Sequence, residues 1–326
     1  MRNETQQTPP AGVVRTFPTA PNRENLTLGG LADAYMAAYV GRDPGRIGVV
    51  ALWVRHLGAK RVLDVSADDV ADVLEHLAAT PVTKYVGKDR ATGAPLLRTF
   101  GARAPATINR MRSVVSALFT FAQKRRLTPR GWVNPCREVA TLLGNNERTR
   151  FLTSDERERL LRVCRASPWP RLYLLALMAI TTGARRGELL SLRYQDLDLA
   201  AGTAHVRQSK NGGQRVLPLL PAVVAEIRRF GKAAPEALLF GSIRRPGKPM
   251  VVDNLFTSAV RTAHIEDFHF HDLRHSCASY LAQSGASLLE IADVLGHRTL
   301  DMVRRYAHLT VAHKTALVAR VLGGIG

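Results

Sequence analysis

The spacing of apolar and polar residues predicts a mainly helical chain. From position 28 onward, apolar side chains return every three or four residues, which is the period of a helix with one buried face. The first such set comprises Leu28, Leu31, Ala32, Tyr35 and Tyr39. Further helices are expected over 46–57, after Ser66, and from Thr107 to residue 122, with Ser66 and Thr107 as N-caps. Residues 172–180 are almost wholly apolar and predict a buried helix.

Two regions interrupt the helical pattern. Residues 80–104 mix glycine, proline and β-type residues, which indicates an irregular excursion with a short hairpin. Short strands are expected at 197–199, 204–206 and 216–219. The turn 209–213, Ser-Lys-Asn-Gly-Gly, lies between the last two and is typical of a β-hairpin. The predicted fold class is therefore mainly α with a small β-sheet in the second half (α+β).

The same pattern divides the chain into four segments. Residues 1–25 are polar and aperiodic and predict a flexible N-terminal segment. Residues 26–130 form a helical domain, and 131–150 form a linker that contains proline and glycine. The second domain, 151–326, opens with Thr153 and Glu156, the spacing of a capping box at a helix start.

Charge suggests the kind of partner. The 326 residues contain 46 Lys and Arg against 27 Asp and Glu, a net charge of +19. Such an excess favours a polyanion, most commonly nucleic acid, although a solvated basic surface is the alternative. From Arg103 to Arg130 there are basic residues and no acidic ones. The candidate DNA-binding residues in this run are Arg110, Arg112, Lys124, Arg125 and Arg126.

Composition also limits the compartment. No run of about 18 uncharged apolar residues is present, so a membrane span is not expected. The N-terminus lacks the apolar core of a secretory signal. Three widely spaced cysteines suit reduced thiols in the cytoplasm, and Cys277 is expected to be a small buried helix residue.

The most informative residues lie between 271 and 306. His271 and Arg274 are three positions apart, so on a helix they share one face. His297 follows a glycine at the end of an apolar segment, and Tyr306 comes nine residues later. Cutting a phosphodiester without metal needs cations on the phosphate oxygens, proton donors and acceptors, and a nucleophile. Arginine, histidine, lysine and tyrosine fit these roles.

Two earlier residues complete this set. Arg185 stands at a predicted helix start, where backbone N–H groups favour anions, and Lys210 stands at the tip of the predicted hairpin. Arg186 is expected to be an ordinary surface residue, and Glu188 to brace the site. Lys232 and Lys248 are rival lysines in other loops. Tyr194 and Tyr280 are rival tyrosines, but Tyr280 lies in an apolar stripe and is expected in the core.

In this order and spacing, the motifs resemble those of the tyrosine recombinase (phage integrase) family. They are Thr182-Gly183-Ala184-Arg185-Arg186-Gly187-Glu188-Leu189, Lys210, His271-Asp272-Leu273-Arg274-His275, Leu295-Gly296-His297 and Tyr306. The resemblance covers residues 150–326. The first half resembles the family's helical core-binding domain only loosely.

The resemblance implies a role for each residue. Arg185 and Arg274 would clamp the scissile phosphate, and His297 would add a hydrogen bond. Lys210 would act as general acid, His271 as base, and Tyr306 would form a 3′-phosphotyrosyl link. It further implies a two-domain clamp on double-stranded DNA, a homotetramer on two paired sites, and no metal or other cofactor. The resemblance also implies accessory DNA-bending or directionality proteins and a cytoplasmic, nucleoid-associated location. The segment after Tyr306 would dock either on its own subunit (in cis) or on a neighbouring one (in trans).

Three alternatives remain open. His269, His271 and His275, with His264 nearby, could bind zinc, although the interleaved arginines would repel a cation. A type IB topoisomerase uses the same residue types on a single duplex. A non-catalytic DNA-binding relative is the third possibility, and the presence of Tyr306 argues against it.

Overall fold

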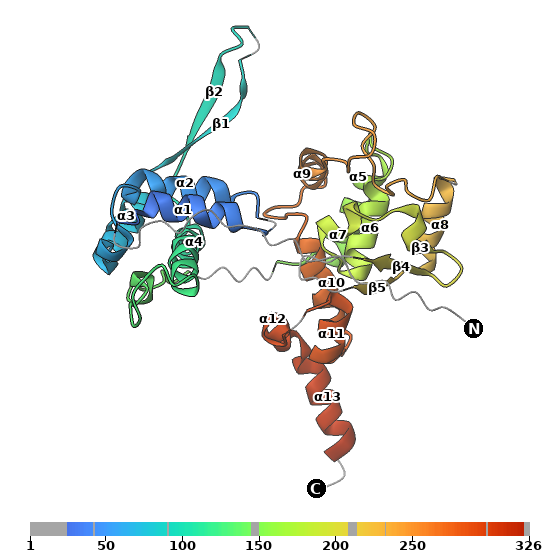
Figure 1. The fold of residues 1–326 in the computed structure, drawn as a ribbon. Helices are drawn as coiled ribbons and strands as arrows, with labels where there is room; N and C mark the ends of the chain where they lie inside the picture. The colour runs from blue at the N-terminus through green and yellow to red at the C-terminus, as the bar shows by residue number, and fades with distance from the viewer. Residues whose placement is uncertain are drawn as a thin grey trace, which may run out of the picture. The chain divides into compact units, whose positions relative to one another are not determined.

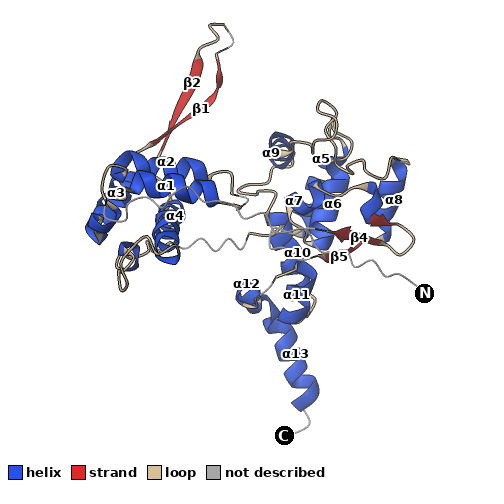
Figure 2. Ribbon diagram, in the orientation of Figure 1, coloured by secondary structure: helices blue, strands red, loops and turns tan. Residues whose placement is uncertain are grey.

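The chain divides into two compact units, residues 1–146 and 147–326. The computed structural model describes residues 25–41, 43–89, 91–144, 150–207, 214–231, 233–297 and 299–322 (Figure 1). Within these ranges the chain is mainly helical with two small antiparallel sheets (Figure 2). The predicted α+β class is confirmed.

The described part of the first unit contains four α-helices: α1 (Leu28–Ala38), α2 (Arg46–Leu57), α3 (Ala67–Ala79) and α4 (Pro105–Lys124). Short 3₁₀ turns cover Val62–Asp64 and Pro135–Arg137. The apolar stripes meet in one core, where Trp53, Leu118 and Phe119 are fully buried. The indole N–H of Trp53 donates to the Met111 carbonyl at 3.0 Å and so links α2 to α4.

The helix starts test the predicted caps. Ser66 caps α3, and its hydroxyl accepts from the Asp69 backbone N–H at 3.1 Å while the Asp69 carboxylate accepts from the Ser66 N–H at 2.8 Å. The expected cap at Thr107 is wrong. Helix α4 begins at Pro105, two residues earlier, and Ala104 is its N-cap with no side-chain hydrogen bond. Proline is favoured in the first helical turn because its missing N–H would be unpaired there anyway.

A β-hairpin joins α3 to α4, where an irregular excursion with a short hairpin was expected. Strands β1 (Val82–Lys88) and β2 (Pro95–Phe100) pair antiparallel, with a register shift between Tyr85 and Gly87. In Figure 1 the hairpin projects away from the four helices of its unit.

The second unit contains nine α-helices in its described part. The first five are α5 (Ser154–Arg165), α6 (Leu172–Thr182), α7 (Arg186–Leu190), α8 (Pro221–Arg229) and α9 (Asp253–Thr262). The others are α10 (Asp272–Gln283), α11 (Leu288–Leu295), α12 (Asp301–Arg304) and α13 (Val311–Leu322). A 3₁₀ turn over Ala307–Thr310 joins the last two. Thr153 and Glu156 form the predicted capping box of α5.

The sheet of this unit has three antiparallel strands in sequence order: β3 (Leu197–Asp198), β4 (Thr203–Val206) and β5 (Arg215–Pro218). A 3₁₀ turn over Tyr194–Asp196 precedes β3. Strands were expected close to these positions. The predicted turn at 209–213 lies outside the described residues.

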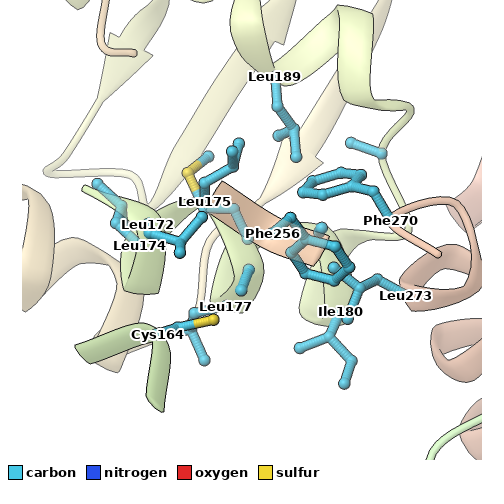
Figure 3. Packing of buried hydrophobic residues seen from close by; sticks show 14 of the residues in the cluster. Cys164, Leu172, Leu174, Leu175, Leu177, Ile180, Leu189, Phe256, Phe270 and Leu273 are labelled. Atoms are coloured by element: carbon cyan, nitrogen blue, oxygen red, sulfur yellow. The ribbon is translucent and has the colours of Figure 1, made fainter. Parts of the chain in front are cut away.

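Two apolar clusters hold the second unit together. The larger surrounds α6, which is buried along nearly its whole length as predicted, and includes Leu175, Phe256 and Leu273 (Figure 3). The smaller joins α10, α11 and α12 and contains Leu295 and Tyr306. Burying Tyr306 in this second cluster fixes the position of a residue that the sequence singled out. No helix in the described ranges is long and apolar enough to cross a membrane.

Candidate active site

The end of α6 is joined to α10 by Arg274. Gly183 caps α6 in the left-handed region (φ 59°), and its carbonyl accepts a hydrogen bond from Arg274 Nη1 at 2.6 Å. A side chain at 183 would be strained by this φ, and its Cβ would come within 2.3 Å of Leu295 Cδ2. Glycine is therefore needed where α6, α10 and α11 meet.

Arg274 is a buried cation with an unused donor. Its side chain is 4% exposed, and burial first, then the neighbouring Arg185, lower the pKa of Arg274 to about 10. It remains charged at neutral pH. Its Nη2 has no hydrogen-bond partner among the described residues. A buried charged donor without a partner is costly, and a bound anion would satisfy it.

Arg185 is held at the start of α7 by Glu188. The buried Glu188 carboxylate accepts from the Arg185 backbone N–H and from Arg185 Nη1, both at 2.9 Å. Burial opposes ionisation of Glu188, but the Arg185 backbone N–H and the charge of Arg215 outweigh it, so the pKa of Glu188 is lowered. Glu188 thus braces Arg185, as the sequence suggested.

Arg215, at the start of β5, completes this network. Its Nη2 donates to Glu188 at 2.9 Å, and its Nη1 donates to the Val294 carbonyl at 2.8 Å. Gly296 follows α11 in the left-handed region (φ 65°), and a Cβ there would meet Arg215 Cδ at 2.9 Å. Arg215 therefore connects the sheet, the Arg185 turn and the segment that leads into His297.

His297 lies in the field of these arginines. Desolvation, followed by the charges of Arg274 and Arg185, lowers the pKa of His297 to about 3, so its imidazole is neutral at pH 7. Its Nδ1 is buried and has no partner in the described part of the chain. A neutral imidazole beside cationic guanidinium groups suits an anionic ligand, because the arginines supply the charge and the ring supplies a hydrogen bond.

The two histidines of α10 lead to Tyr306. His271 is the exposed N-cap residue of α10, and its ring meets His275 edge to face with centroids 5.1 Å apart. His275 Nδ1 lies 2.5 Å from Tyr306 Oη. Burial lowers the pKa of His275 to about 4 and raises the pKa of Tyr306, which is 2% exposed, to about 12. A neutral His275 thus lies next to a protonated phenol, and the oxygen of the predicted nucleophile is buried.

Comparison with known proteins assigns this sequence to a family. The model of the phage integrase family matches residues 150–313. The chain belongs to the phage integrase family. The shufflon-specific DNA recombinase of Escherichia coli is 35% identical over 212 residues, 63% of this chain and 52% of that protein. The type 1 fimbriae regulatory protein FimE of E. coli K12 is 34% identical over 185 residues, 52% of this chain and 91% of that protein.

The integrase of Salmonella phage P22 is 31% identical over 183 residues, 52% of this chain and 46% of that protein. The chain thus spans about half the length of several curated relatives. Solved integrases share its fold. The Tn1549 transposon integrase, in complex with a circular intermediate DNA, superposes with a TM-score of 0.67 at 19% identity and covers 91% of this chain and 100% of that one. A lambda integrase tetramer bound to a Holliday junction gives 0.63 at 20% identity, covering 88% and 79%.

Five of the six predicted catalytic residues of this integrase-family chain lie in described parts of the second unit: Arg185, His271, Arg274, His297 and Tyr306. Lys210 lies outside the described residues. The rival Tyr280 is half-buried against the larger apolar cluster, and its hydroxyl donates to the Leu152 carbonyl at 2.9 Å. The described residues contain no group of three His, Cys, Asp or Glu side chains that could hold a metal ion.

Sequence reasoning missed two members of the site. Arg215 occupies the same phase of β5 as the buried Leu217, while Val216 between them is exposed. In a strand, residues two positions apart face the same side, so an arginine two positions before a buried leucine could have indicated a buried, functional arginine. His275 was expected only as the last residue of a family motif and as an alternative zinc ligand. No spacing rule pointed to its bond with Tyr306, which is 31 residues away.

The predicted basic run divides into two groups. Arg110 pairs with Asp43 at 2.8 Å, and Arg112 donates to the Cys136 carbonyl, so both act within the first unit. Lys124, Arg125 and Arg126 are exposed at the end of α4. These last three remain predicted DNA-binding residues.

Proposed function

We propose that this chain is a site-specific DNA recombinase that cuts and rejoins DNA through a covalent 3′-phosphotyrosyl intermediate on Tyr306, without metal or ATP. The observation that carries the proposal is a pair of buried polar atoms without partners among the described residues, Arg274 Nη2 and His297 Nδ1, in the unit that also buries Tyr306. A phosphate oxygen would accept from the guanidinium, and from the imidazole in its Nδ1-protonated tautomer.

The chemistry assigns each group a step. Arg185 and Arg274 neutralise the non-bridging oxygens as the five-coordinate transition state forms, and His297 donates a hydrogen bond to it. Tyr306 Oη attacks phosphorus, its proton passes to His271 as base, and the 5′-oxygen leaves with a proton from Lys210. A 5′-hydroxyl from a partner strand then attacks the phosphotyrosine and releases Tyr306. The exchange conserves the number of phosphodiester bonds, so it needs no external energy source.

Tyr306 must leave its resting position to react. Its hydroxyl is bonded to His275 and its side chain is buried in the small cluster. A phosphorus atom cannot approach Oη in that state. DNA binding would turn the segment containing α12 so that Oη leaves His275 and meets the phosphate. The raised pKa of Tyr306 keeps the phenol protonated, and therefore weakly nucleophilic, until the arginines and the substrate are in place.

The proposal extends to the whole chain. Residues 26–130 would be a core-binding domain and 151–326 the catalytic domain, joined by the linker 131–150, so that the two clamp duplex DNA. The active form would be a homotetramer on two paired sites, in the cytoplasm and on the nucleoid, with accessory DNA-bending or directionality proteins as further partners. The lambda integrase tetramer on a Holliday junction is the structural neighbour that supports this assembly.

The test is a trapped covalent adduct. The protein is incubated with duplex DNA carrying its recombination site, nicked near the cleavage point, in EDTA. We expect a protein–DNA adduct that survives denaturation and is lost in Tyr306→Phe. Tyr280→Phe is the matched control, because it removes a tyrosine hydroxyl on α10 that is bonded to the Leu152 carbonyl and not to His275.

Three outcomes would overturn the proposal. An adduct that persists in Tyr306→Phe, or that requires zinc, would assign the chemistry elsewhere. Relaxation of supercoiled DNA by the monomer without sequence preference would indicate a type IB topoisomerase. Site-specific binding with no adduct in any condition would indicate a non-catalytic relative.

A further inference from the structure

The hairpin β1–β2 is a well-formed element. Its turn is closed by Asp89, whose carboxylate accepts from the backbone N–H groups of Ala91 at 2.9 Å and Thr92 at 2.8 Å. At its base, Arg103 Nη1 donates to the carbonyls of Leu77 at 2.7 Å and Thr80 at 3.0 Å, which ties the hairpin to the end of α3. The hairpin is therefore anchored at its base, and Asp89 braces the described part of its turn.

This element buries little of itself. Every residue of β2 is exposed, as are most residues of β1. Figure 1 shows it projecting beyond the helices of its unit. A lone two-stranded hairpin is marginally stable in water, because it has no core on either face. A binding partner would supply the missing contacts.

One face of the hairpin carries paired cations. Lys84 lies directly across from Arg98, and both approach the Phe100 ring, at 5.4 Å and 5.5 Å from its centroid. Like charges directly opposite each other destabilise a strand pair. No carboxylate pairs with either side chain among the described residues, and Asp89, the one acidic residue in 82–100, is engaged in the turn. The pair is thus uncompensated within the described chain.

We propose that the Lys84–Arg98 face of this hairpin binds the phosphate backbone of duplex DNA flanking the cleavage site. The proposal rests on the recombinase function above and adds a second contact surface to it. Two phosphates would neutralise the facing cations, which the Phe100 ring holds close together on one face. A two-stranded ribbon also fits the width of the major groove.

Charge favours DNA over a protein partner. Residues 82–100 contain four basic residues and one acidic residue. The opposite face presents Thr83, Thr99, Tyr85 and Leu97, which are polar or apolar but uncharged. A protein-binding hairpin would not need its like charges side by side, whereas a polyanion gains from them.

The experiment compares binding across salt concentrations. The double variant Lys84→Gln/Arg98→Gln is measured against the wild-type chain on DNA that extends beyond the core site. Each lost phosphate contact lowers the slope of log K against log salt by about 0.9, so a decrease of about 1–2 is expected. The hydroxyl-radical footprint should lose protection at its outer edge. The double variant Thr83→Val/Thr99→Val, on the other face, is the control and should keep slope and footprint.

The outcomes separate this inference from the recombinase function. If the glutamine variant keeps the wild-type salt dependence and the wild-type footprint, the hairpin does not contact DNA. The recombinase function would still stand in that case, provided that the Tyr306 adduct forms. Normal DNA binding with loss of oligomer assembly would also overturn it, because the hairpin would then dock protein. The charge-reversed pair Lys84→Glu/Arg98→Glu should lower affinity further, and circular dichroism is the measurement that checks the folding of both variants. Failure of the wild-type chain to form any adduct would instead count against the recombinase function.

Discussion

At the scale of single residues, burial keeps the site's histidines neutral. His275 sits between His271 and Tyr306, and its pKa is lowered to about 4 chiefly by burial. A neutral Nδ1 can accept the phenol hydrogen of Tyr306, whereas a protonated ring could only donate. The resting bond between the two residues therefore depends on pH.

The pH dependence of stability follows from this shift. An exposed histidine in the unfolded chain binds a proton near pH 6.5, and folded His275 does so only near pH 4. Between these values the unfolded state holds more protons, so the free energy of unfolding should fall as pH drops from about 6.5 to 4. For His275 alone we expect a loss of roughly 2–3 kcal/mol.

Urea unfolding of the protein at pH 7 and pH 4.5 measures this loss. The variant His275→Asn should lose less stability on acidification than the wild-type chain. His308→Asn, at an exposed position, should behave like the wild type. Equal acid sensitivity in all three proteins would contradict the assignment of His275 as a buried neutral histidine.

At the scale of elements, Arg215 connects three parts of the site. It reaches Glu188 beside Arg185 and the Val294 carbonyl just before Gly296 and His297. Both partners are buried or half-buried, and the Glu188 side chain is 3% exposed. Removing one member of a buried charge pair leaves the other uncompensated and typically costs about 3–5 kcal/mol.

Arg215→Met should therefore lower the free energy of unfolding by roughly 3 kcal/mol, because Glu188 keeps only Arg185 as a charge partner. It should also slow adduct formation more than tenfold at saturating DNA, since Arg185 loses its brace. Arg215→Lys should restore part of the rate. Arg207→Met also removes the partner of a buried carboxylate, Asp196, but outside the Glu188 network, so it should lower stability with little change in the rate. An adduct rate unchanged in Arg215→Met would show that Arg215 only stabilises the fold.

Local chemistry explains which elements were predictable from sequence. The capping boxes at Ser66 and Thr153 and the helix over Arg46–Leu57 depend on neighbours within four residues, and all three are confirmed. The start of α4 was missed because a proline in the first turn competes with a threonine cap two residues later. The extent of β1–β2 was missed because cross-strand pairing joins residues up to 18 positions apart.

The same distinction applies to the site. Ordered motifs indicated Arg185, His271, Arg274, His297 and Tyr306, because each stands at a spacing typical of the family. The partners of these residues depend on the folded chain. Arg215 meets Glu188 across 27 residues, and Gly183 accepts from Arg274 across 91. Neither contact follows from the local spacing of apolar and polar residues, so the sequence alone could not predict them.

At the scale of the whole molecule, the net charge of +19 is shared by both halves. Residues 1–150 contain 22 basic and 12 acidic residues, and 151–326 contain 24 and 15. An excess of positive charge on both halves is consistent with a chain in which each half contacts the same long polyanion. The end of α4, with Lys124, Arg125 and Arg126 exposed, is the part of the first unit's basic run best placed to do so.

Replacing Lys124, Arg125 and Arg126 by alanine should weaken DNA binding and lower the slope of log K against log salt by about 2–3, if each side chain neutralises one phosphate. The charge-keeping variant Lys124→Arg/Arg125→Lys/Arg126→Lys should retain the wild-type slope, because counterion release depends on charge and not on the shape of the cation. Fluorescence anisotropy measures the DNA affinity of both variants from about 50 to 200 mM salt. Affinity that depends on phosphate contacts falls steeply over this range. An alanine variant with the wild-type slope would show that this end of α4 faces solvent in the complex, and would leave the Lys84–Arg98 face as the basic surface of the first unit to test.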